Sequence, residues 1–319
     1  MTQPSDLETI DPPSAAGRQP VARVAARVLN RQVDWLRLGS QLLQLPIDPR
    51  TVHDMRVAVR RSRVALRTFR RLVGREQTTA LTSELRWIAE LLGETRDWDI
   101  VIGRVKQRSV DPAARLAPDD ATQRTALEAF AKARAEAHAR LVDGLASPRY
   151  AQLVQSLVVT ARDLEQKASE AAEADRFADF AAKRIGRALK RVRSRLDDDI
   201  ETLDVDQLHG VRIRVRRLRY LVEFSADLGG TTFVDVATRL AAAQDALGAA
   251  QDAVVAERLL DLVARRAAAG QDGDGGLESI LARFKRDERR SALRARSRLA
   301  RTWRRLPKTL RMLKRALRR

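Results

Sequence analysis

The sequence predicts an all-α protein built of two tandem helical bundles. Nearly everything after residue 20 is rich in Ala, Leu, Arg and Glu, and apolar residues recur with a period close to 3.6. Alternating β-branched residues, which are typical of strands, are scarce. Apolar residues make up 44% of the 319 residues, so a sizeable core can be buried and the length suits two domains.

Residues 1–20 are polar, contain four prolines, and are expected to be a disordered lead. After this lead, each helix is predicted from its apolar period and from the residues at its ends. A glycine-rich connector is expected at 271–276. The expected helices span about 21–45, 50–73, 77–93, 96–108, 119–146, 149–169, 177–201, 205–228, 231–248, 250–269, 276–304 and 307–318.

Residues that start or stop helices separate these segments. Asp48 followed by Pro49 offers an N-cap and a first-turn proline for the second helix. Gly93, Gly248 and Gly270 are expected at the C-terminal ends of helices, because glycine is frequent there.

Two aspartates, Asp97 and Asp252, each lie four residues after one of these glycines. We expect them to be the N-caps of the next helices, because aspartate is favoured at that position. The alternative is a role at a ligand site, where each could orient a guanidinium.

An internal repeat divides the chain into two halves. The segment HDMRVAVRRSR, which begins at His53, recurs 156 residues later as HGVRIRVRRLR from His209. Further along, LRWIAELLGETRDWDI is echoed after 155 residues by LAAAQDALGAAQDAVV. The repeat predicts a duplicated helical bundle, with one copy over 21–170 and the other over 177–319.

One helix in each copy carries a stripe of basic residues, whose members step about 5 Å along the helix axis. Like charges at this spacing cost a few tenths of a kcal/mol per pair, so helix propensity does not explain them. The stripe lies beside apolar residues that should pack on a neighbouring helix, and no acid occurs between Met55 and Gly74. The stripes comprise His53, Arg56, Arg60, Arg63 and Arg67 in the first copy and His209, Arg212, Arg216 and Arg219 in the second, where Glu223 replaces the last cation.

The net charge of +19 indicates a polyanionic partner, such as nucleic acid, an anionic membrane surface or another phosphate polymer. Only eight of the 61 basic residues are lysines, and arginine suits bidentate recognition of phosphate oxygens. Arginine stays charged when buried, so a half-buried row needs acids, water or a bound anion. The row suits a linear polymer more than a single phosphate, although a solvated charged face is the alternative. Five cations on the preceding helices are expected to flank it: Arg27, Arg31, Lys183, Arg187 and Lys190.

Other functional classes are disfavoured by what the sequence lacks. The chain has no cysteine, which excludes disulfides and thiolate sites and favours a reducing cytoplasm. The N-terminus does not resemble a secretory signal, and no apolar run approaches the ~20 residues of a membrane span, so we expect a soluble protein. No carboxylate cluster accompanies a histidine at ligand spacing, and no phosphate-binding loop or hydrolase motif occurs. We therefore expect no metal, no cofactor and no enzymatic activity.

The histidines have different expected roles. His53 and His209 are interpreted as neutral hydrogen-bonding ends of the basic rows or as packed core residues, and the sequence leaves both alternatives open. His138 has no counterpart in the second copy and is interpreted as a surface residue.

The motifs HDMRVAVRRSR, HGVRIRVRRLR and LGETRDWD resemble those of the CHAD family, the conserved histidine α-helical domain. The resemblance covers nearly the whole chain after residue 20. It implies two helical bundles related by a pseudo-two-fold axis, with basic helices facing each other across a central pore. It also implies binding of inorganic polyphosphate, often at polyphosphate granules. The residues that would line the pore are His53, Arg56, Arg60, Arg63, His209, Arg212, Arg216 and Arg219.

The main alternative is a general nucleic-acid-binding protein, for which a pI near 11.3 and arginine-rich helices are typical. Aromatic residues are only 4% of the chain, few for stacking on single strands, and no helix-turn-helix pattern is evident. The C-terminal segment KTLRMLKRALRR fits this alternative best, and fits contact with anionic lipid equally. A polyphosphate hydrolase would need metal-holding carboxylates, which the sequence does not place near the stripes. Oligomeric state and chain-length preference are not predicted.

Overall fold

The computed structural model describes residues 17–42, 48–110, 120–170, 176–196, 200, 202–269 and 275–317. The prediction of an all-α protein is confirmed, since the described elements are helices and the one β feature among them is an isolated bridge between Pro20 and Arg176. The helices are α2 (Val21–Leu42), α3 (Pro49–Thr68), α4 (Arg70–Val73), α5 (Arg75–Val110), α6 (Asp120–Ala146), α7 (Pro148–Glu170), α8 (Phe177–Arg193), α9 (Val205–Phe224), α10 (Ala226–Ala269) and α11 (Gly275–Ala316).

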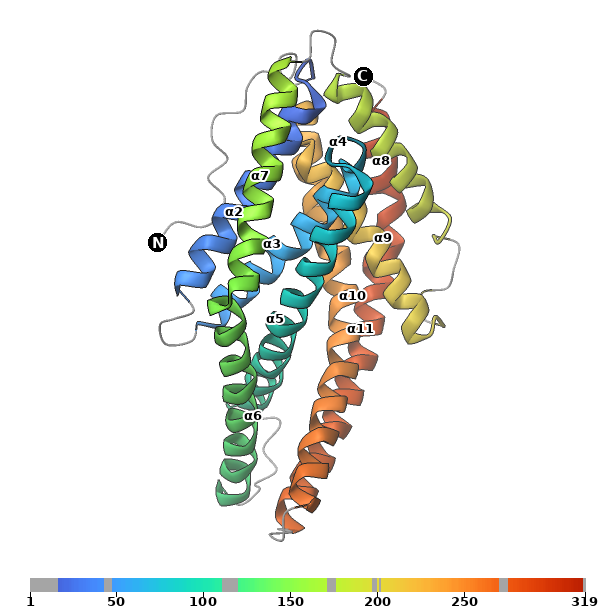
Figure 1. Cartoon of the computed structure of the whole chain (residues 1–319). Coiled ribbons are helices and arrows are strands. Elements are labelled where there is room, and N and C mark those ends of the chain that lie inside the picture. Colours follow the sequence, from blue (N-terminus) through green and yellow to red (C-terminus); the bar gives the residue numbers. More distant parts are fainter. Residues whose placement is uncertain are drawn as a thin grey trace.

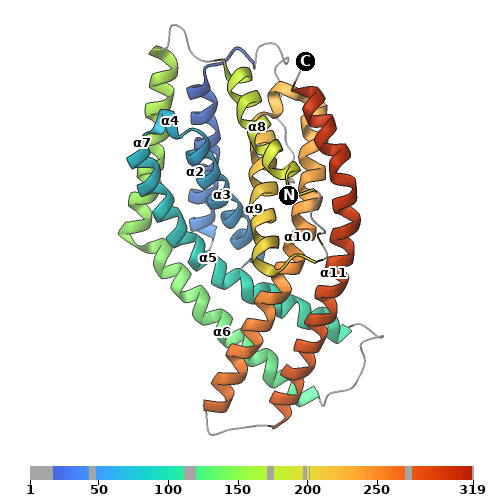
Figure 2. The ribbon, with the colours of Figure 1, turned by 90° about the vertical axis from the view of Figure 1, so that its right-hand side faces the viewer.

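The helices pack as an elongated bundle with two long hairpins (Figure 1). In one half α2 packs on α3 and α7, and in the other α9 packs on α8 and α10. The hairpins α5–α6 and α10–α11 extend from one end of the bundle and contact each other. Helices α3 and α9, which carry the predicted basic stripes, are neighbours at the centre of the molecule (Figure 2).

The start of the basic helix is set by local hydrogen bonding in both halves. The side chain of Asp48 accepts a hydrogen bond of 2.9 Å from the backbone N–H of Arg50, and Pro49 stands in the first turn, which confirms the prediction. At α9, Asp204 and Gln207 form a reciprocal capping box, with hydrogen bonds of 2.8 and 3.0 Å.

The prediction that helices end at Gly93 and Gly248 is wrong. Helix α5 continues through Gly93, and α10 continues through Gly248 to Ala269. Asp97 and Asp252 therefore lie inside helices and are not N-caps. The cost of a mid-helix glycine, about 1 kcal/mol, is smaller than the packing energy of the buried leucines that precede the glycines.

Helix α11 also merges two expected helices, since it continues through Pro307. Buried Leu306 and Leu310 keep this region packed on the core, which offsets the hydrogen bond that a proline cannot donate. A true break occurs at Gly230, whose φ of 49° and ψ of −138° kink the start of α10.

Several expectations fall outside the described residues. These are residues 1–16 of the lead, the helix end at Gly270 and residues 271–274 of the connector. Residues 275–276 belong to α11. No helix in the described parts of the chain is both long and apolar enough to cross a membrane.

The hydrophobic core runs through both halves of the chain. The main cluster joins α2, α3, α5 and α7 to α8, α9, α10 and α11. A second cluster lies between the two long hairpins, where Phe130 of α6 contacts Trp98 of α5 and Phe284 of α11 at ring-centroid distances of 6.2 and 6.3 Å. The relative position of the halves is therefore set by apolar packing.

Replacing Phe130 with alanine should lower the free energy of unfolding by about 3–5 kcal/mol, because it opens a cavity between the hairpins. Urea denaturation followed by circular dichroism measures this change. Leu38→Ala is the control, since Leu38 is 46% exposed and should change stability by only about 0.5 kcal/mol. Equal effects of the two substitutions would contradict the packing described.

Candidate anion-binding site

The central arginines of the basic stripes on α3 and α9 are brought together. Arg56 is close enough to Arg212, and Arg63 to Arg216, for their charges to repel. Residues early in α3 thus lie near residues early in α9, and later residues near later ones. The two helices therefore run side by side in the same direction, and their guanidiniums form one cluster.

We call this cluster the arginine ladder; it consists of Arg56, Arg60, Arg63, Arg212 and Arg216. All five residues are half-buried. The Nε atoms of three of them (Arg60, Arg63 and Arg212) are buried and have no hydrogen-bond partner among the described residues. Over the same part of the chain, Arg56 is the one ladder residue with a salt bridge, to Asp97. The ladder therefore presents buried positive charge that the protein leaves largely unneutralised.

The pKa values report this repulsion. Burial lowers the pKa of Arg216 to about 10, with further lowering by the charges of Arg212 and Arg60. The pKa of Arg63 is lowered by burial, then by Arg67 and by Arg86 of α5. Guanidiniums in such surroundings favour a bound anion, because it replaces the hydration they lost.

Carboxylates gather at one end of the ladder. Asp97 lies 3.8 Å from Arg56, which also donates a hydrogen bond of 3.5 Å to the carbonyl of Leu92. Burial raises the pKa of Asp97, Arg56 opposes this, and the charge of Asp252 raises it again. Burial lowers the pKa of Arg212, and Asp252 opposes that change. Asp97 thus pairs with Arg56, and the charge of Asp252 acts on Arg212, so both aspartates lie at the ladder, in line with the second interpretation of the sequence.

The two mid-helix glycines face these same arginines. A Cβ on Gly93 would lie 3.1 Å from Nη1 of Arg56, and a Cβ on Gly248 would lie 3.8 Å from Nη2 of Arg212. Each guanidinium lies close against the backbone of the neighbouring helix. A Cβ at position 93 would press on the guanidinium of Arg56, whereas at position 248 there is room for one beside Arg212.

More arginines continue the positive charge beyond the other end of the ladder. Phe69, at the end of α3, stacks on Phe180 of α8 at 5.6 Å, and the guanidinium of Arg184 lies 5.1 Å from the Phe180 ring. Burial lowers the pKa of Arg217, followed by the charges of Arg191, Arg184 and Arg67. None of the cations gathered here has a salt bridge among the described residues. We call this group the flanking cluster: Arg67, Arg71, Arg184, Arg187, Arg191 and Arg217.

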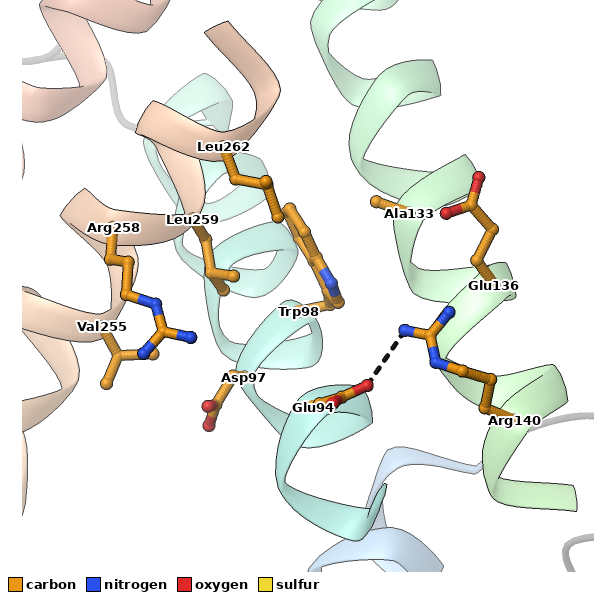
Figure 3. A pocket seen from close by; sticks show the side chains of 10 residues that line it. All are labelled: Glu94, Asp97, Trp98, Ala133, Glu136, Arg140, Val255, Arg258, Leu259 and Leu262. Atoms are coloured by element: carbon orange, nitrogen blue, oxygen red, sulfur yellow. Dashed lines mark hydrogen bonds and ion pairs between the residues drawn. The ribbon is translucent and has the colours of Figure 1, made fainter. Parts of the chain in front are cut away.

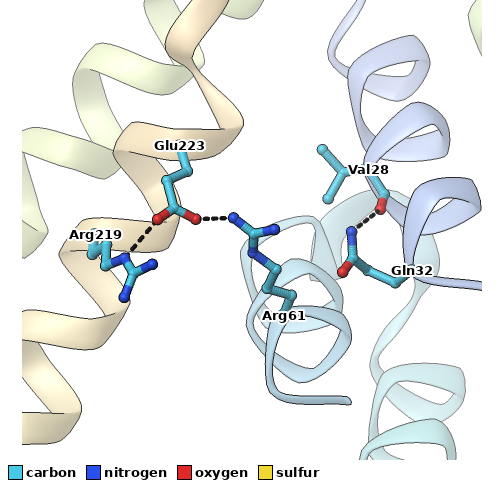
Figure 4. A network of polar contacts seen from close by, with 5 residues as sticks. All are labelled: Val28, Gln32, Arg61, Arg219 and Glu223. Atoms are coloured by element: carbon cyan, nitrogen blue, oxygen red, sulfur yellow. Dashed lines mark hydrogen bonds and ion pairs between the residues drawn. The ribbon is translucent and has the colours of Figure 1, made fainter. Parts of the chain in front are cut away.

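The positive charge of Arg219, a predicted site residue, is neutralised by an ion pair within the protein. Glu223 accepts a hydrogen bond of 2.6 Å from Nε of Arg219 and a second one from Arg61 of α3 (Figure 4). Both guanidiniums also lie over the ring of Tyr220, at 5.7 and 5.5 Å. Replacing the last cation of the stripe by Glu223 therefore creates a local ion-pair network between the two basic helices.

The expected flanking cations are not all brought to the ladder. Arg27 forms an exposed ion pair of 2.7 Å with Asp227. Arg187 belongs to the flanking cluster, since its charge lowers the pKa of Arg184 after burial does. Arg31, Lys183 and Lys190 are exposed, and no contact in the described structure joins them to the ladder.

The histidines are exposed at the start of each basic helix, so the core alternative for His53 and His209 is wrong. Partial burial lowers the pKa of His53, followed by the charges of Arg96 and Arg60, so its ring is neutral at pH 7. Arg96 of α5 was missed as a site residue, although it stands in the quoted motif LGETRDWD. His138, expected at the surface, is half-buried, and its Nδ1 has no partner among the described residues.

A hollow of about 240 Å³ lies between the long hairpins, beyond the acidic end of the ladder (Figure 3). Its wall includes Asp97 and Glu136, an ion pair of 2.9 Å between Glu94 and Arg140, and the ring of Trp98. Carboxylates and guanidiniums are mixed here, so the hollow does not continue the purely basic surface.

The arrangement matches a known family. The model of the CHAD domain matches residues 27–261, which is more than half of the sequence, so the chain belongs to the CHAD domain family. This confirms the resemblance drawn from the two histidine motifs. The fold is similar to that of the CHAD domain from the plant Ricinus communis, with 25% identity and a TM-score of 0.70 over 90% of this chain and 93% of that one. It is also similar to that of PptA from Streptomyces chartreusis, with 19% identity and a TM-score of 0.64 over 90% of this chain and 100% of that one.

Two curated relatives are uncharacterized proteins of Mycobacterium tuberculosis, Rv2226 of strain H37Rv and MT2285 of strain CDC 1551. Each is 28% identical over 272 residues, which are 80% of this chain and 48% of the relative. The chain therefore spans about half the length of the curated relatives it matches.

Arg216→Gln should raise the free energy of unfolding at pH 7 by about 1–2 kcal/mol, because it removes a half-buried charge without a partner. The folded pKa of about 10 lies below the ordinary 12.5, so the destabilisation is complete below pH 10. It disappears as the pH rises from about 10 to 12.5. Urea denaturation at pH 7 measures the change, with exposed Arg301→Gln as the control. A less stable Arg216→Gln protein would show that the guanidinium has a partner.

Proposed function

We propose that the chain binds inorganic polyphosphate non-catalytically in the arginine ladder between α3 and α9. The observation that carries the proposal is the set of half-buried guanidiniums whose buried Nε atoms have no partner among the described residues. Phosphate oxygens accept hydrogen bonds from guanidiniums in charge-assisted pairs, which would satisfy these donors. The binding free energy would also include counterion release, so affinity should fall with salt.

The shape of the basic surface favours a polymer over a single phosphate. Successive ladder residues rise about 5 Å along each helix, and the flanking cluster extends the row past Phe69. Half-burial favours a thin chain, because a duplex is too wide to bring its phosphates onto guanidiniums set between two helices. These features together support polyphosphate over duplex nucleic acid.

Corresponding contacts in the two halves support internal duplication. Gly93 faces Arg56 in the first half, and Gly248 faces Arg212 in the same way in the second half. We infer that copies over 21–170 and 177–319 are related by a pseudo-two-fold axis, with the ladder lining a central pore between them. The pore and an association with polyphosphate granules in the cytoplasm go beyond membership of the family, and both are part of the proposal.

The double variant Arg60→Glu/Arg216→Glu should lower the affinity for polyphosphate by about 100-fold or more, because it reverses two charges at the centre of the ladder. Affinity is measured by displacing labelled long-chain polyphosphate with unlabelled polyphosphate, duplex DNA or single-stranded RNA. All competitors are used at equal phosphate concentration and at two salt concentrations. Arg75→Glu/Arg162→Glu is the matched control, since both residues are exposed and lie away from the ladder.

For the native protein, polyphosphate should displace the label far better than DNA or RNA at the higher salt. Equal competition by DNA or RNA would favour the alternative, a general nucleic-acid-binding protein. Unchanged polyphosphate affinity in the folded double variant would refute the placement of the site.

Asp252→Asn should tighten polyphosphate binding by about three- to fivefold, because it removes a negative charge that acts on Arg212. Asp235→Asn on the same helix is the control, since Asp235 is paired with Arg239 and lies away from the ladder. The same competition titration measures both variants. Weaker binding by Asp252→Asn would mean that orienting Arg212 matters more than the charge of Asp252.

A further inference from the structure

The outer face of α11 is a second basic surface that the ladder does not include. After Glu288 the helix carries no acidic residue. Eleven exposed cations follow; Arg289 is paired with Glu257, and none of the other ten has a salt bridge among the described residues. We call these residues the α11 face: Arg290, Arg294, Arg298, Arg301, Arg304, Arg305, Lys308, Arg311, Lys314 and Arg315.

This surface points away from the ladder. The opposite side of α11 is buried through Leu299, Trp303, Leu306, Leu310 and Leu313, which pack into the main core. Both α9 and α11 pack on α10, and Figure 2 shows α10 between them. A ligand on the α11 face therefore leaves the ladder accessible, and one protein molecule has two separate basic surfaces.

General richness in arginine does not explain the α11 face. On α6, exposed Glu128 lies one turn before exposed Lys132, and Arg140 is paired with Glu94 of α5. On α10, Arg239 is paired with Asp235 one turn away. The chain thus mixes charges on the exposed faces of α6 and α10, whereas the α11 face keeps one sign despite the repulsion between residues one turn apart.

The chemistry of the face indicates what it binds. From Arg290 to Arg315 the cations extend over roughly 38 Å along the helix. Leu293 is the one large apolar residue exposed here, so the face lacks the apolar groups that insert into membranes. No aromatic residue is exposed on it for stacking on bases. A duplex would touch a straight row only where its backbones cross it, whereas a flexible chain of phosphates can lie along the whole row.

We infer that the α11 face is a second polyphosphate-binding surface, so that one protein molecule holds two polyphosphate segments and cross-links separate chains. This inference rests on the proposed function of the ladder and adds a second binding surface to it. Two surfaces on each protein and many binding sites on each polymer suffice to build a network.

Cross-linking is tested by light scattering of the full chain mixed with long-chain polyphosphate at several ratios. Scattering by the native protein should rise near charge balance and fall again when polymer is in excess. The variant Arg298→Glu/Arg301→Glu/Arg305→Glu/Lys308→Glu should reduce the maximum at least fivefold. The affinity of its remaining site, the ladder, for short polyphosphate should stay within about twofold when measured by calorimetry, because the ladder residues are unchanged.

The matched control is Arg75→Glu/Arg124→Glu/Lys132→Glu/Arg162→Glu, which makes the same change in net charge at exposed positions on other helices. It should scatter like the native protein. A version of the α11 variant with glutamine at the same four positions keeps the test valid if the glutamates disturb folding, which circular dichroism detects.

Full scattering by the α11 variant would overturn the inference, and so would an equal loss in the control. Scattering of the native protein with duplex DNA or anionic vesicles, but not with polyphosphate, would also overturn it and assign the face to another partner. The proposed function of the ladder fails separately, if short polyphosphate does not bind the folded α11 variant, in which the ladder is the remaining site, in calorimetry.

Discussion

Repulsion among half-buried guanidiniums between α3 and α9 is the constraint on which the rest of the structure depends. An unpaired charge removed from water costs several times more than a surface ion pair contributes. The fold brings five half-buried guanidiniums together, of which Arg56 alone has a salt bridge in the described chain, and the buried Nε atoms of Arg60, Arg63 and Arg212 find no partner there. Free energy from elsewhere in the molecule must hold them in place.

Apolar packing supplies that free energy. The main core extends from α2 to α11, and Trp98, Phe130 and Phe284 join the long hairpins. Local features then shape the site. Asp97 and Asp252 place negative charge at one end of the ladder, and Gly93 and Gly248 face the guanidiniums of Arg56 and Arg212. The second half departs from the first where Glu223 ties Arg219 to Arg61.

Much of this could be predicted from the sequence, because helical periodicity and the repeated arginine motif are local signals. The stripe residues Arg56, Arg60, Arg212 and Arg216 do converge. The sequence could not show that helices run through Gly93, because local glycine preference was outweighed by tertiary packing of the neighbouring leucines. Nor could it show the flanking cluster, since the contact of Phe69 with Phe180 joins segments more than a hundred residues apart.

The continuous core has a mechanical consequence for the ladder. The like charges of α3 and α9 repel each other, and aromatic and aliphatic contacts hold the two helices together against this repulsion. A bound polyanion would reduce the repulsion by supplying the missing counter-charge. The occupied protein would then be more heat-resistant than the empty one, since a ligand that binds only the folded state shifts the folding equilibrium towards it. Neither half could offset this repulsion alone, because each relies on the other for part of its hydrophobic core.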